Sequence, residues 1–211
     1  YNSRMKPQVN HFSGTDLIVE YIERYVCPTI LSTDITGQVP YRFPGDKRSL
    51  VVFLSAEGEY GANQTLPALG HELTIKYGLS CELLQGLAQR KGPDRNYLPN
   101  MQALAHADLV VLFARRRALP AAQMQQLKAY LGRKKPLVAI RTSSHAFALR
   151  GGQMPKGYAQ WPAFDNEVLG CDYKGYPHGE TRTHVVPEAR IHPIMQGIKG
   201  PFQIRETMYR S

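Results

Sequence analysis

The sequence lacks any apolar run that approaches the roughly 20 residues needed to cross a membrane, so we expect no membrane-spanning segment. The first residues, Tyr1 to Pro7, also lack the apolar centre of a signal peptide. Because the chain starts at Tyr1 and stops inside a patterned segment at Ser211, we expect a fragment or processed product that is truncated at its C-terminus. The composition predicts a soluble globular protein, and the sequence leaves open whether it is cytoplasmic or exported.

Cysteine is scarce. The chain has three, Cys27, Cys81 and Cys171, and their scattered positions form neither a CxxC metal motif nor a disulfide framework. Cys81 lies in an apolar run, which is typical of a small core residue. A single disulfide between two of the three is left open.

The sequence also has no internal repeat, no low-complexity tract and no basic helix. Its formal net charge is +9, but lysine and arginine are dispersed and are not interleaved with aromatic residues. That distribution argues against nucleic-acid binding and favours a solvated surface or a small anionic ligand.

Residues 1–48 differ from the rest of the chain. Thr15 and Asp16 are placed to cap a helix that runs to about Val26, and the stretch from Thr29 to Asp46 predicts an extended connector. Because a lone amphipathic helix is marginal in water, we expect this arm to pack on the main domain, on a second copy or on a partner.

Residues 49–211 alternate between apolar runs and amphipathic stretches, which predicts one α/β domain. The spacing requires crossovers between parallel strands, so we expect a flavodoxin-like doubly wound parallel sheet with helices on both faces. One helix is expected from about Thr65 to Gly78, and another from Leu119-Pro120 to Gly132. Beyond Phe147 we expect loops, a short helix over 162–169 and a strand near 183–186. The expected sheet strands are 49–55, 79–84, 108–114 and 137–140.

Polar side chains follow three of these strands, where ligands bind in open α/β sheets. The first strand is followed by Glu57, Glu59 and Tyr60, the third by Arg115, Arg116 and Arg117, and the fourth by Arg141 and His145. Arginine recognises carboxylates, phosphates and vicinal hydroxyls with defined geometry. We therefore expect one shared site at this end of the sheet.

Four segments carry a family likeness: residues 107–117, 137–147, 161–165 and 192–197. Together they resemble the ThuA-like (trehalose utilisation) family of the class I glutamine amidotransferase-like superfamily. The resemblance covers residues 49–211 and not the arm. Glu206 and Tyr209 match the acidic and aromatic residues with which members of the family end. It implies a flavodoxin-like fold and a sugar or sugar derivative as the small-molecule partner.

The chain departs from true class I amidotransferases at their nucleophile. The turn after the fourth strand has Arg141 where those enzymes present a cysteine, followed by Thr142, Ser143 and Ser144. Without a thiolate on that turn, glutamine hydrolysis is not expected. Cys171 is too far along the chain to replace it.

The predicted catalytic residues are His145, Glu57 and Ser143. Glu57 could act as a general base or could compensate the dipole of the following helix. Ser143 could be a nucleophile, or Thr142, Ser143 and Ser144 could cap the next helix. The predicted ligand-binding residues are Glu59, Tyr60, Arg115, Arg116, Arg117, Arg141, Thr142, His178, His192 and Glu206.

The histidines allow further hypotheses. His178 lies in a loop rich in glycine and proline that could cover the site, and His192 precedes Pro193 and could fix a turn. No cofactor and no metal are assigned, although His145, His178 and His192 with an acid would allow a divalent metal. Three functions stay open: a sugar-metabolism protein, a non-catalytic interaction protein that docks through residues 1–48, and a Ser/His-dependent hydrolase.

Overall fold

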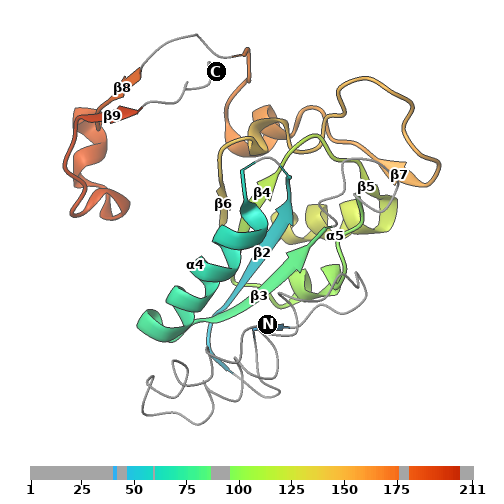
Figure 1. Cartoon of the computed structure of the whole chain (residues 1–211), viewed down its shortest axis with the longest axis horizontal. Helices are drawn as coiled ribbons and strands as arrows, with labels where there is room; N and C mark the ends of the chain where they lie inside the picture. The colour runs from blue at the N-terminus through green and yellow to red at the C-terminus, as the bar shows by residue number, and fades with distance from the viewer. Residues whose placement is uncertain (1–39, 42–46, 59, 87–95, 176–180, 205–211) are drawn as a thin grey trace. The chain divides into compact units, whose positions relative to one another are not determined.

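The computed structural model describes residues 40–41, 47–58, 60–86, 96–175 and 181–204 (Figure 1). The chain divides into two compact units, Tyr1–Phe164 and Asp165–Ser211. The helix expected in the arm lies outside the described residues. Within them, no helix combines the length and the apolarity that crossing a membrane would require.

The first unit is built on a five-stranded sheet with the order β1-β3-β2-β4-β6. Strands β3, β2, β4 and β6 run parallel, as predicted, and β1 pairs antiparallel with β3 at one edge. Part of the expected connector, Pro40–Tyr41, is therefore a strand of the sheet. The strand bounds are Pro40–Tyr41 for β1, Leu50–Ala56 for β2, Ser80–Gln85 for β3, Leu109–Ala114 for β4 and Leu137–Ala139 for β6.

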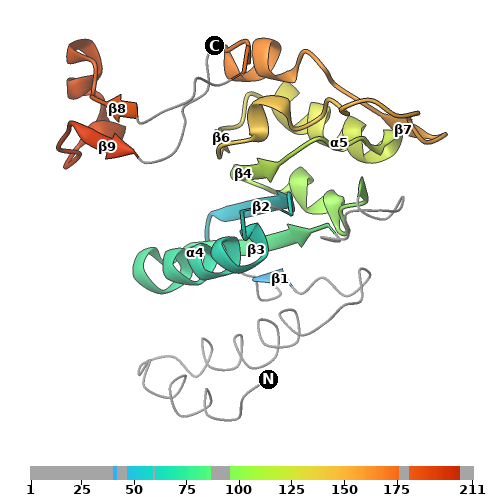
Figure 2. The ribbon, with the colours of Figure 1, turned by 45° about the horizontal axis from the view of Figure 1, so that its top comes forward.

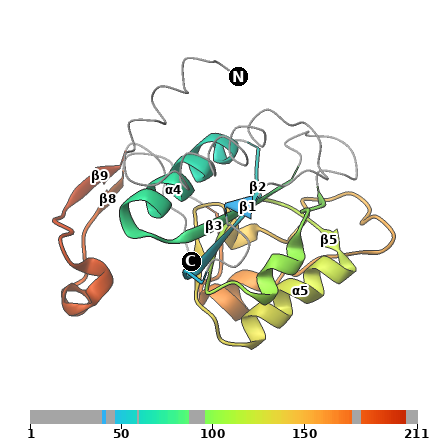
Figure 3. The same cartoon turned by 90° about the horizontal axis from the view of Figure 1, so that it is seen from below.

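Two helices cover opposite faces of this sheet (Figure 3). Helix α4, Ala62–Tyr77, joins β2 to β3, and helix α5, Ala121–Gly132, joins β4 to β6. Helix α4 ends at Gly78 as predicted: Gly78 has a φ of 64°, and its N–H donates to the carbonyl groups of Leu73 and Thr74.

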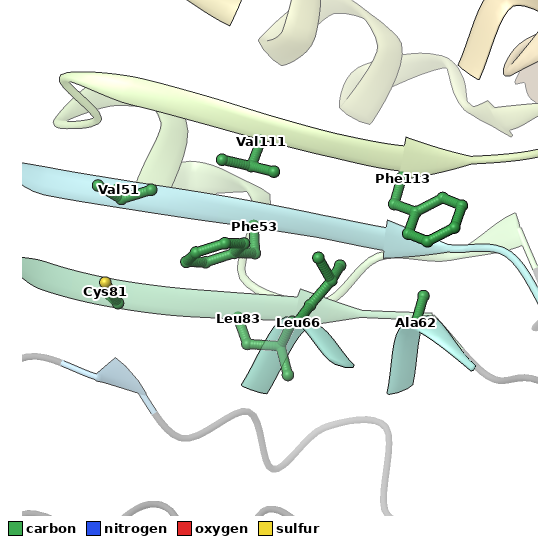
Figure 4. Close-up of a cluster of buried hydrophobic side chains, with 8 residues drawn as sticks. All are labelled: Val51, Phe53, Ala62, Leu66, Cys81, Leu83, Val111 and Phe113. Carbon is green, nitrogen blue, oxygen red and sulfur yellow. The ribbon is translucent and has the colours of Figure 1, made fainter. Parts of the chain in front are cut away.

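The face under α4 is a continuous apolar cluster (Figure 4). Alternate residues of β2, β3 and β4 point toward the helix, because side chains alternate between the faces of a strand. Helix α4 approaches closely at Gly70, where an added Cβ would lie 3.4 Å from a ring carbon of Phe53. The buried members of the cluster are Val51, Phe53, Ala62, Leu66, Cys81, Leu83, Val111 and Phe113.

The opposite face is covered by α5 and by a short 3-10 helix, Met101–Ala105, which packs against α5. Met124, Leu127 and Tyr130 are buried on α5, as the apolar spacing predicts. Beyond this layer, β5 (Leu119–Pro120) pairs antiparallel with β7 (Tyr158–Ala159), and β7 lies beside α5 (Figure 2).

The strand order creates a switch point between β2 and β4. From β2 the chain crosses over α4 to β3 on one side, and it then returns to β4 on the other side of β2. In open α/β sheets, ligands bind outside the carboxyl ends of the strands at such a point. In this chain those ends lead to Glu57 and Arg115.

The second unit, Asp165–Ser211, is made of short elements. The helix expected over 162–169 is a π-helical turn, Asp165–Leu169. The strand expected near 183–186 is displaced toward the N-terminus: β8 spans Thr181–Thr183 and pairs antiparallel with β9, Phe202–Ile204. Two 3-10 turns, Pro187–Ile191 and Pro193–Met195, lie between these strands.

Candidate functional site

Glu57 follows β2, and its side chain bonds backbone amides at the N-terminus of helix α4. Its carboxylate accepts hydrogen bonds from the backbone N–H of Tyr60, at 2.9 and 3.1 Å, and of Ala62, at 3.0 Å. The residue is only 4% exposed. Negative charge is stabilising at a helix N-terminus, so these bonds account for a buried carboxylate and allow α4 to begin at Ala62, before the predicted Thr65.

Tyr60 and Arg141 form a pair that bridges the carboxyl end of β4. The guanidinium carbon of Arg141, after β6, lies 5.8 Å from the centroid of the Tyr60 ring, after β2. Strands β2 and β6 flank β4, so the contact connects two loops that are separated by a strand. Tyr60 is 44% exposed. The structure thus brings together two predicted ligand residues and leaves part of an aromatic surface open to solvent.

The three arginines after β4 have different environments. Arg117 is buried, and its Nε donates to the carbonyl oxygen of Ala56 at 2.7 Å. Arg116 has a φ of 54°, and its Nη1 donates to the carbonyl oxygen of Ala148 at 3.2 Å. Arg115 is half-buried, and its backbone N–H donates to the carbonyl oxygen of Ala56. The side chain of Arg117 thus bonds the end of β2, and that of Arg116 bonds the loop that follows the turn Ser143–His145.

The hydroxyl groups of Thr142 and Ser143 bond to β4 and do not cap a helix. Thr142 Oγ1 donates to the carbonyl oxygen of Ala114 at 3.2 Å, and Ser143 Oγ donates to that of Leu112 at 3.0 Å. Ser143 Oγ also accepts from the N–H of Ala114 at 3.2 Å. The capping interpretation of these two residues is therefore wrong: their hydroxyls take the place of a backbone partner beyond the end of β6.

Thr142 is also conformationally strained, which the sequence analysis missed. It is buried and has φ 81° and ψ −19°, in a region that β-branched residues rarely adopt. The strained residue of this turn is thus Thr142, not Arg141, where we had placed the missing nucleophile. The segment from Ile140 to Ser144 has no glycine or asparagine, so no sequence signal marks the positive φ.

His145 lies in the 3-10 turn Ser143–His145 and is 7% exposed. Its Nδ1 is 3.1 Å from Ser144 Oγ, and its carbonyl oxygen accepts from the backbone N–H of Arg116. The histidine thus ties the turn after β6 to the loop after β4. Its predicted catalytic role stays a prediction.

Three predicted residues, Glu59, His178 and Glu206, lie outside the described residues, as does Tyr209. Over the part of the chain that the structure describes, no group of three or more His, Cys, Asp or Glu side chains is placed to hold a metal ion.

His192 belongs to the second unit, where its Nδ1 accepts from the backbone N–H of Ile194 at 3.2 Å. This contact fixes a turn, which is the role that the sequence offered for His192 besides ligand binding. The same unit contains an open hollow of about 750 Å³. Its lining includes three basic side chains, His184, Arg190 and Lys199.

Neither described cysteine takes part in a disulfide. Cys81 is a core residue, as predicted, and burial raises the pKa of its thiol to about 11. In the second unit, desolvation by burial raises the pKa of the Cys171 thiol, and the negative charges of Asp165 and Asp172 raise it further. Both therefore favour the protonated, unreactive form at neutral pH.

The site thus offers a partly exposed aromatic ring, arginine donors and a buried histidine in the loops that follow β2, β4 and β6. Such groups can stack on a ligand ring and donate hydrogen bonds to its oxygens. Ser143, in contrast, is fully buried and bonded to β4. When the whole chain is compared with known proteins, no family model, no curated protein and no solved structure matches it.

Proposed function

We propose that this chain is a ThuA-like protein with a flavodoxin-like domain that binds a sugar or sugar derivative at the carboxyl ends of β2, β4 and β6. The proposal rests on the resemblance for the ligand class. The contact between Tyr60 and Arg141 carries the location, because it joins two residues predicted to bind ligand from loops that are distant in sequence.

The chemistry of this pair fits a carbohydrate. The partly apolar face of a sugar ring packs on an aromatic side chain, while guanidinium N–H groups donate to its hydroxyl oxygens. Arg115, half-buried at the end of the strand between them, is a further candidate donor. His145, in the turn after β6, is the residue we propose for acid–base chemistry on the bound sugar.

The two alternatives have less support. A serine hydrolase needs an accessible nucleophile within reach of a base, whereas both hydrogen bonds of Ser143 Oγ go to β4. The interaction hypothesis depends on residues 1–48, and the described part of that segment is limited to Pro40–Tyr41 and Lys47–Arg48.

A thermal-shift screen of sugars and keto-sugars tests the proposal. A ligand at 100 times its Kd stabilises the native state by about 2.7 kcal/mol, which corresponds to roughly 5–11 °C for a chain of this size. We expect such a shift in the wild-type protein and its loss in Arg141→Ala and Tyr60→Ala.

Lys128→Ala is the matched control. Lys128 Nζ lies 4.7 Å from the ring centroid of Trp161, so this substitution also removes a cation from an aromatic face, but on helix α5. We expect the control to keep the full ligand response. Equal responses in all the variants would overturn the proposed location, and no response to any sugar would overturn the ligand class.

A further inference from the structure

We infer that Glu57 is a specificity-determining residue that makes the site reject phosphorylated sugars and accept uncharged ones. This inference rests on the proposed function. It concerns the point where a doubly wound fold ordinarily binds a phosphate, namely the start of the helix that follows the strand beside the switch point.

In this chain a side chain of the protein already occupies that point. A phosphate at a helix N-terminus is held by backbone N–H groups and by the positive end of the helix dipole. Here the N–H groups of Tyr60 and Ala62 donate to the Glu57 carboxylate, and that of Gln64 donates to the carbonyl oxygen of Gly61. Three of the amides around the start of α4, those of Tyr60, Ala62 and Gln64, are thus bonded within the protein, two of them by Glu57 itself.

The carboxylate also opposes a phosphate electrostatically. It is 4% exposed, so solvent screens its charge poorly, and a phosphate monoester carries a charge close to −2 at neutral pH. Two like charges within a few ångströms in such surroundings repel each other strongly enough to weaken binding by about tenfold or more.

Two of the nearby arginines are held by backbone carbonyl groups. Arg117 is buried with its Nε on the carbonyl oxygen of Ala56, and Arg116 donates to that of Ala148. The guanidinium of Arg141 lies over the ring of Tyr60. The groups that remain, Tyr60, Arg115 and Arg141, offer a ring face and guanidinium donors, which suit the ring and hydroxyl groups of an uncharged sugar.

The test is a calorimetric titration of the full chain with two matched ligand pairs: glucose and glucose 6-phosphate, and trehalose and trehalose 6-phosphate. We expect at least one uncharged sugar to bind about tenfold or more tightly than its phosphate. In Glu57→Gln, which keeps an acceptor oxygen but removes the charge, this preference should fall by about tenfold.

Glu72→Gln is the control, because it changes the net charge by the same amount and lies on α4, the helix whose first amides Glu57 bonds. Glu72 is exposed, with 57% of its side-chain surface accessible, and pairs with Lys76. The control should keep the wild-type preference. If Glu57→Gln and Glu72→Gln change the preference equally, the effect is one of overall charge and the inference is wrong.

The remaining outcomes separate the two proposals. Tighter binding of a phosphorylated sugar by the wild-type protein overturns the role of Glu57 but leaves the proposed function standing. Absence of binding by all four ligands counts against the proposed function, and the inference fails with it. If Glu57→Gln does not fold, the wild-type comparison of each pair still decides.

Discussion

At the level of single residues, hydroxyl groups hold the turn after β6 against β4. Strand β6 pairs with β4 only over Leu137–Ala139, so the backbone of Ala114 has no strand residue opposite it there. Ser143 and Thr142 supply the partners from their side chains. This arrangement keeps Thr142 in its left-handed conformation and positions Arg141 beside Tyr60.

Replacing Ser143 with alanine should therefore destabilise the protein. The change leaves the buried N–H of Ala114 without its acceptor, which costs about 1–3 kcal/mol in the free energy of unfolding. Urea denaturation measures this loss. Ser144→Ala is the matched control and should change stability by less than about 0.5 kcal/mol, because Ser144 is part-exposed and bonds only the neighbouring His145 ring. Equal losses in both variants would contradict the account of the turn.

The buried thiol of Cys81 predicts a pH dependence of stability. Because its pKa is about 11 in the folded state and 9.0 when unperturbed, the folded state holds the proton more tightly. Its contribution is fully present below pH 9 and is lost as the pH rises toward 11, by at most about 3 kcal/mol. Denaturation of wild type and Cys81→Ala across this range should show the steeper fall in wild type. Parallel slopes would refute the prediction.

For single residues, the sequence predicts which strand end a side chain follows better than it predicts which atoms that side chain bonds. The order of strands and polar residues was enough to place Tyr60 and Arg141 at one end of a sheet. For Glu57 the pattern left two roles open, a general base and compensation of the dipole of the following helix, because a carboxylate after a strand has the same sequence signal for both. The hydroxyls of Thr142 and Ser143 were misassigned because their partners are about 30 residues away in sequence.

At the level of elements, strands and helix ends follow from local chemistry. The apolar runs of β2, β3 and β4 became parallel strands that are buried on both faces of the sheet, whereas β6 lies at the edge and its Val138 is 50% exposed. Short pieces were harder to predict: the 3-10 turn at Ser143–His145 and the π-helical turn at Asp165–Leu169 depend on tertiary contacts that periodicity does not contain.

The two helix-terminal glycines give a matched pair of opposite predictions. Gly78 has a φ of 64°, which alanine adopts at a cost, so Gly78→Ala should lower the free energy of unfolding by about 1 kcal/mol. Gly132 ends α5 without a positive φ and has open space at its Cβ, so Gly132→Ala should raise stability by about 0.5–1 kcal/mol. Thermal unfolding compares them. The same sign for both changes would refute the conformational argument.

At the level of the whole molecule, the strand order determines where a ligand can bind. The reversal between β2 and β4 gathers loops from opposite sides of the switch point, and the contact of Tyr60 with Arg141 is its local result. The net charge of +9 attracts anions to the molecule in general, whereas Glu57 sets the local preference. The two effects act at different distances and respond differently to salt.

The most direct measurement of the central claim is a crystal structure of the chain soaked with the sugar that gives the largest thermal shift. The account predicts a sugar ring against the exposed face of Tyr60, with oxygen atoms within hydrogen-bond distance of the Arg141 guanidinium, beyond the carboxyl ends of β2 and β4. A sugar bound instead in the hollow lined by His184, Arg190 and Lys199, with the surface of Tyr60 empty, would contradict it.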